Sequence, residues 1–127
     1  MGWLQKIFGS VPPPQPAAAS GESHHAVLLH LKLSNDAFGT PDEVKAMHAL
    51  QDELDRAIRG AAAGELDGDE FGGGYCVIYM YGPDAEKLWD AIAPVLETRP
   101  FMDGSHAMKR PGPPGAPEER IDLHWEG

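Results

Sequence analysis

Tyr75, Tyr79 and Tyr81, together with Val77, fall on one side of an alternating segment, and the residues between them fall on the other. Side chains of an extended strand point alternately to opposite faces, so the three tyrosines should share one face. A tyrosine buries a large ring while its hydroxyl stays hydrogen-bonded or wet, which suits it to binding surfaces. We therefore expect Tyr75, Tyr79 and Tyr81 to anchor a partner, either another protein or a second copy of the chain in a homodimer.

An acidic segment precedes the tyrosines and contains Glu65, Asp67, Asp69 and Glu70. Its alternating carboxylates resemble the start of a calcium loop. However, such a loop needs glycine where Glu70 stands and a bidentate glutamate where Cys76 stands, so we expect no metal site. The segment also lacks a basic residue and a phosphate-binding glycine motif. Asp67, Asp69 and Glu70 are instead expected to attract a basic protein and to speed its association.

His30 is the residue whose type and position would allow acid-base chemistry. It would approach Tyr79 if the first strand and the tyrosine strand pair. As an alternative function we therefore keep a small-molecule-binding or enzymatic dimer with a pocket at the open sheet face. The other histidines show no zinc spacing, and no nucleophile stands with a base and an orienting group. The sequence thus assigns no catalytic residue, no metal and no cofactor.

The charge balance limits the classes of partner. The chain carries 20 acidic side chains against 10 Lys and Arg, for a formal charge of −10. This excess repels phosphate backbones, which excludes nucleic acid and favours a basic protein. The single cysteine, Cys76, cannot form an internal disulfide and is expected to be a small buried hydrophobe. No apolar run reaches the roughly 18 residues of a membrane helix, so we expect a cytoplasmic protein.

Residues 1–9 differ from the rest of the chain and are expected to form an amphipathic tip. Its apolar residues at helical spacing are Trp3, Leu4, Ile7 and Phe8. Two turns are too short for a stable isolated helix in water, so the tip must dock on its own domain, a partner or a lipid surface. Membrane contact is expected only through this tip. Residues 10–23 form a Pro/Ala-rich linker, and residues 24–127 form one domain.

The domain that positions these residues is predicted to follow the order β-α-β-β-α-β. Strands are expected at His25–Leu33, within Leu66–Phe71, at Tyr75–Tyr81 and near His106–Arg110, with an extra C-terminal edge strand at Arg120–Trp125. The triple glycine before Tyr75 predicts a bulged hairpin.

Two helices complete the prediction. The capping box that begins at Thr40 opens a helix that runs to about Ala63. The second helix starts after Asp84, and Pro94 should kink or end it. Two amphipathic helices on one face of an antiparallel sheet predict a ferredoxin-like α+β sandwich with two layers.

The segment ELDGDEFGGGYCVIYMYGPDAEKLWDAIAPVL, within residues 65–97, resembles small uncharacterised bacterial proteins. In those proteins an acidic D-G-x-E-x-G segment precedes a strand that ends in the equivalent of Tyr81-Gly82-Pro83-Asp84-Ala85. The size, acidity and α+β outline are also similar to immunity proteins that neutralise bacterial toxins, and loosely to protein inhibitors of ribonucleases. This similarity implies a non-catalytic interaction module and transfers no catalytic residue.

Overall fold

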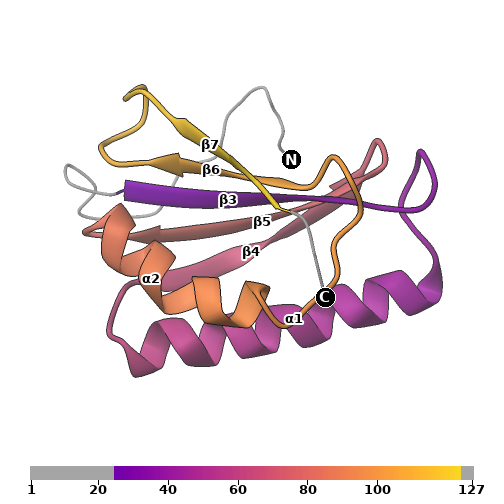
Figure 1. The fold of residues 1–127 in the computed structure, drawn as a ribbon, viewed down its shortest axis with the longest axis horizontal. Helices are drawn as coiled ribbons and strands as arrows, with labels where there is room; N and C mark the ends of the chain where they lie inside the picture. The colour runs from indigo at the N-terminus through magenta and orange to yellow at the C-terminus, as the bar shows by residue number, and fades with distance from the viewer. Residues whose placement is uncertain (1–24, 124–127) are drawn as a thin grey trace.

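The computed structural model describes residues 25–123 and shows two helices and five strands within that range (Figure 1). In chain order the elements are β3 (His25–Lys32), α1 (Pro41–Gly60), β4 (Glu65–Gly72), β5 (Tyr75–Gly82), α2 (Ala85–Leu96), β6 (His106–Arg110) and β7 (Glu119–Asp122). The two strong strands and the short strand at His106–Arg110 match their predicted bounds to within one residue. The C-terminal edge strand is also present and begins one residue earlier than predicted, at Glu119. The last two residues of its predicted range, 124 and 125, lie outside the described residues.

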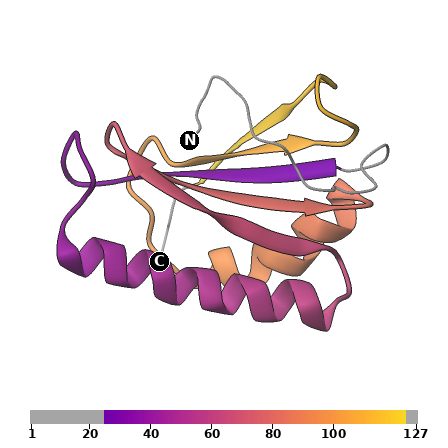
Figure 2. The ribbon, with the colours of Figure 1, turned by 180° about the vertical axis from the view of Figure 1, so that it is seen from behind.

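The strands form one antiparallel sheet in the order β4-β5-β3-β6-β7. Both helices cover the same face of this sheet (Figures 1 and 2). The predicted α+β class and two-layer arrangement are therefore confirmed. The element order is β-α-β-β-α-β-β, because the predicted edge strand is present as β7 beside β6, so the topology is not the standard four-stranded ferredoxin form.

Helix α1 starts where the capping box predicts. The Thr40 hydroxyl accepts the Glu43 N–H at 3.1 Å, and the Glu43 carboxylate accepts the Thr40 N–H at 3.0 Å. Leu50, Leu54 and Ile58, one helical repeat apart, point into the core. The helix ends at Gly60, earlier than the predicted Ala63, because the chain turns away through residues with non-helical conformations.

Helix α2 is fixed at its start by two side chains. The Asp84 carboxylate accepts N–H groups from the first turn, and Nδ1 of His25 accepts the N–H of Ala85 at 2.9 Å. The second bond ties the helix to the beginning of β3. Pro94 lies inside the last turn, and the helix ends two residues later at Leu96.

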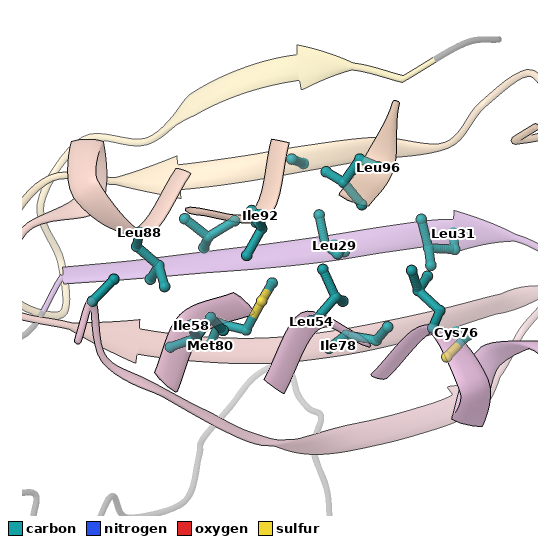
Figure 3. Packing of buried hydrophobic residues seen from close by; sticks show 14 of the residues in the cluster. Leu29, Leu31, Leu54, Ile58, Cys76, Ile78, Met80, Leu88, Ile92 and Leu96 are labelled. Atoms are coloured by element: carbon teal, nitrogen blue, oxygen red, sulfur yellow. The ribbon is translucent and has the colours of Figure 1, made fainter. Parts of the chain in front are cut away.

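The hydrophobic core lies between the helices and the sheet (Figure 3). Its side chains come from the two helices and the central strands, and they include Leu29, Leu31, Leu54, Ile58, Cys76, Ile78, Met80, Leu88, Ile92 and Leu96. Full burial of one such aliphatic side chain stabilises the fold by roughly 1.5–3 kcal/mol. Cys76 is fully buried among them, which confirms its predicted role.

Strands β4 and β5 form the predicted bulged hairpin. The register shifts between Leu66 and Gly68, so Asp67 is an extra residue on β4. At the turn, Gly73 and Gly74 have φ of 59° and 88°, a region that favours glycine. Backbone hydrogen bonds from Leu33 to Gly74 and from Gly74 to Ala37 hold this turn against the loop after β3.

Three predictions concern residues outside the described range. They are the amphipathic tip at residues 1–9, its docking residues Trp3, Leu4, Ile7 and Phe8, and the linker at residues 10–23. Within residues 25–123, neither helix combines the length and the apolar character that crossing a membrane requires.

Candidate functional site

The open sheet face, opposite the helices, brings together side chains from all five strands. Strand register determines which side chains lie side by side. Tyr79 on β5 pairs with Leu28 on β3, and Leu28 pairs in turn with Met108 on β6. These residues and Val77 are half-buried although neither α1 nor α2, the two helices of residues 25–123, covers them. We call Leu28, Val77, Tyr79 and Met108 the apolar band.

Carboxylates border the apolar band on the side of β4. Glu65 pairs with Tyr81 and Glu70 pairs with Val77, so both glutamates lie on the open face. Asp67 sits in the bulge between them, and its charge acts on both Tyr79 and Tyr81. We call Glu65, Asp67 and Glu70 the acidic edge.

Tyr79 joins the apolar band to the acidic edge. Its hydroxyl donates to Oε1 of Glu70 at 2.9 Å. Burial, this hydrogen bond and nearby negative charge raise the pKa of Tyr79 well above its usual value. The phenol therefore stays neutral, and the bond fixes the orientation of the ring within the apolar band.

The acidic edge concentrates charge in a partly desolvated place. Burial and repulsion from Glu65 raise the pKa of Asp67 above its usual value. Burial and the charge of Asp67 raise the pKa of Tyr81 to about 12, although Arg110 acts in the opposite direction. A cationic group placed here would relieve the repulsion among these carboxylates.

Asp69 lies apart from the other predicted acidic residues. It pairs with Ile78, whose side chain is in the core, so Asp69 is on the helix-covered face of β4. There its carboxylate accepts a hydrogen bond from the Gln51 amide of α1, and it lies 3.6 Å from Nε2 of His48. The structure therefore brings Asp67 and Glu70 to the tyrosines and places Asp69 in a contact between α1 and β4.

His30 does not lie opposite Tyr79, because the register places Leu28 there and sets His30 against Val77. Its ring instead stacks on His106 of β6, with centroids 4.7 Å apart and planes 6° from parallel. Burial and the positive charges of His106 and Arg120 lower the pKa of His30 to about 4. His30 is therefore a weak base at neutral pH, which speaks against the predicted acid-base pair.

Tyr75 is separated from the other two tyrosines along β5. It pairs with Lys32, whose ammonium lies 5.6 Å from the centre of its ring, and it meets His106 edge-on at 6.3 Å. The His106 Nδ1 is 3.0 Å from the carbonyl of Gly104, which only accepts hydrogen bonds, so this nitrogen carries a hydrogen. Tyr75 thus belongs to a cluster of basic and aromatic groups at the other end of the face.

The described residues do not assemble a recognisable reaction centre. Burial raises the pKa of the Cys76 thiol to about 12, so it remains a protonated core residue. Between residues 25 and 123, no three His, Cys, Asp or Glu side chains are grouped to hold a metal ion. What the open face offers is an apolar band between a carboxylate edge and a histidine pair.

Sequence reasoning missed the contribution of β6 and β7 to this face. His106, Met108 and Arg110 share it because they alternate along β6, and Arg120 pairs with Met108 from β7. The alternation of His106–Arg110 is visible in the sequence and would have indicated the face. The sequence also predicts the C-terminal strand, but not its position beside β6, which depends on the order of strands in the sheet.

Comparisons of the chain with protein-family models, with curated proteins and with solved structures found no match.

Proposed function

We propose that the protein is a non-catalytic interaction module that binds a basic protein segment on its open sheet face. In this proposal, strands β3, β4, β5 and β6 with helices α1 and α2 form a ferredoxin-like sandwich, and β7 adds a fifth strand to it. Immunity proteins and nuclease inhibitors act by binding another protein, and the sequence resemblance to them is part of the proposal.

The apolar band beside the acidic edge is the observation that carries this proposal. A row of half-buried side chains from three strands, Tyr79, Leu28 and Met108, is aromatic and aliphatic on the face that α1 and α2 leave uncovered. Apolar surface that is only partly buried on the uncovered face of a sheet is a candidate interface. The neighbouring Asp67 and Glu70 make the best-matched partner one that combines apolar anchors with Lys or Arg.

Charge favours a foreign partner over a second copy. Each chain carries a formal charge of −10, so two copies repel each other at long range. The acidic edge faces the same side as the apolar band, so it would be brought close to a second acidic molecule. A homodimer remains an outcome that the experiment below detects.

The test begins with selection of random displayed peptides on the full chain. We expect the selected peptides to combine an aromatic or aliphatic residue with several Lys or Arg. Tyr79→Ala should weaken their binding about tenfold or more, the loss typical of an aromatic anchor. Asp67→Asn and Glu70→Gln should each weaken it several-fold, as measured by calorimetry.

Asp69→Asn is the matched control, because it removes a carboxylate from the same strand but from its other face. Peptides without basic residues, or a loss for Asp69→Asn as large as that for Glu70→Gln, would contradict the proposal. Light scattering on the same samples reports self-association. A stable dimer that Tyr79→Ala dissociates would assign the face to a second copy instead.

A further inference from the structure

The first strand in the described part of the chain, β3, is the middle strand of the sheet. β3 starts at His25 and lies between β5 and β6. Its second residue, Ala26, pairs with Tyr81 on one side and Arg110 on the other. The residues that precede His25 are therefore attached at one end of the apolar band.

The residues that precede His25 have a composition that complements an apolar band with an acidic edge. Lys6 is the single charged side chain in residues 1–21, whereas the whole chain carries a formal charge of −10. The apolar residues of this stretch gather in residues 1–9 as Trp3, Leu4, Ile7 and Phe8. The chain thus contains its own segment with apolar anchors and one positive charge.

The length of the linker allows this segment to reach the whole face. Residues 10–24 span up to about 45 Å when extended, at roughly 3 Å per residue. The eight residues of β3 cover only about 26 Å, at roughly 3.3 Å per residue. Attachment at one end of β3 therefore leaves every part of the apolar band within reach.

We propose that residues 1–9 dock on the open face of their own chain and that a partner must displace them. The apolar side chains of this segment cover the apolar band, and Lys6 lies toward the acidic edge. A segment tied by a short linker acts at an effective concentration of up to about the millimolar range, so weak contacts suffice. This inference rests on the proposed function, because the same face is used by both occupants.

A nitroxide label on the tip tests the docking directly. In the full chain, Gln5→Cys provides the attachment point, and the buried Cys76 does not compete for the reagent. We expect paramagnetic broadening of the NMR methyl signals of Leu28, Val77 and Met108. Signals of the outer side of α1, such as Ala49 and Ala46, should stay sharp, because α1 covers the opposite face.

A mixed sample separates the two ways in which the tip can reach the face. Chains that carry the nitroxide but no isotope label are mixed with chains that carry the isotope label but no nitroxide. Broadening that appears only within one molecule supports the proposal, and broadening between molecules assigns the tip to a second copy. Full chains that show no broadening, or whose tip binds vesicles of anionic and neutral phospholipid instead, overturn it.

A second measurement uses the peptides selected on the face. Trp3→Ser combined with Phe8→Ser should strengthen peptide binding, about tenfold if the tip covers the face nine-tenths of the time. Val11→Ser in the linker is the control and should leave the affinity unchanged. Peptide binding without broadening refutes the docked tip alone, whereas broadening without peptide binding refutes the proposed partner alone.

Discussion

Individual side chains on the open face are oriented by contacts with residues of the neighbouring strands. Tyr79 is the clearest case, because its ring belongs to the apolar band and its hydroxyl donates to Glu70 on the neighbouring strand. A hydrogen bond to a carboxylate orients a ring that would otherwise adjust freely on the surface. In the proposed interface Tyr79 would therefore lose little side-chain freedom on binding, as suits an anchor.

His30 carries the residue-scale prediction, which concerns stability against pH. Its pKa is about 4 in the folded protein and about 6.5 in an unfolded chain. As the pH falls below 6.5, the unfolded chain binds a proton that folded His30 does not. Above pH 6.5 the titration of His30 does not change the free energy of unfolding. As the pH falls from 6.5 to 4, it lowers the free energy of unfolding by up to about 3 kcal/mol.

Urea unfolding at pH 7 and pH 5 checks this prediction. His30→Phe should remove about 2 kcal/mol of the stability lost between these pH values. The two groups whose charges act on the ring, His106 and Arg120, stay in place. His48→Gln, on the exposed side of α1, controls for the loss of a histidine. An equal acid loss in wild type and His30→Phe would show that His30 titrates normally.

At the scale of elements, the strong periodic segments were predictable and the partners of each residue were not. The alternation of residues 75–81 and the capping box at Thr40 depend on neighbours in sequence, so both were confirmed. The stacking of His30 on His106 depends instead on the pairing of two residues that are 76 positions apart in the sequence, and no local pattern indicates it.

The bulge in β4 explains why the predicted acidic residues divide between the two faces of the sheet. In a regular strand, Asp67 and Asp69 would share a face and Glu70 would lie on the other. The extra residue between Leu66 and Gly68 changes this alternation, so that Glu65 and Glu70 share the open face while Asp69 turns to α1. A bulge was predicted from the glycines, but its position, which decides the faces, was not.

The prediction at the scale of elements concerns Gly82, because the end of β5 passes close to the connection between α1 and β4 at this residue. A Cβ on Gly82 would lie 2.2 Å from the carbonyl oxygen of Ala63, where the chain passes from α1 to β4. The neighbouring backbone cannot move without shifting β4 against β5. We expect Gly82→Ala to destabilise the protein by about 2 kcal/mol or more, as measured by thermal and urea unfolding.

Gly68→Ala is the matched control for Gly82→Ala. Gly68 lies in the neighbouring strand, and no atom lies within 4 Å of where its Cβ would be. We expect a change within about 0.5 kcal/mol. Equal stability of the two alanine variants would contradict this prediction. It would mean that the backbone around Ala63 moves aside easily and does not fix the register between β4 and β5.

At the scale of the whole molecule, charge and apolar surface would serve different steps of the proposed binding. The net charge of −10 acts over long distances on a basic partner, whereas the apolar band acts only on contact. Salt screens the first effect, with a Debye length of about 10 Å at 0.1 M, and leaves the second nearly unchanged. Association and dissociation rates should therefore respond to different variants.

Stopped-flow binding of a selected basic peptide at low and high salt separates the two contributions. In the wild type, salt should slow association strongly and change dissociation little. Asp67→Asn with Glu70→Gln should lower the association rate and flatten its salt dependence, while Tyr79→Ala should mainly speed dissociation. Asp69→Asn keeps the same net charge as a single edge variant but should lose less of the salt dependence, because its carboxylate faces α1. If salt acted only on dissociation, the acidic edge would be a set of contacts and would not guide the partner to the face.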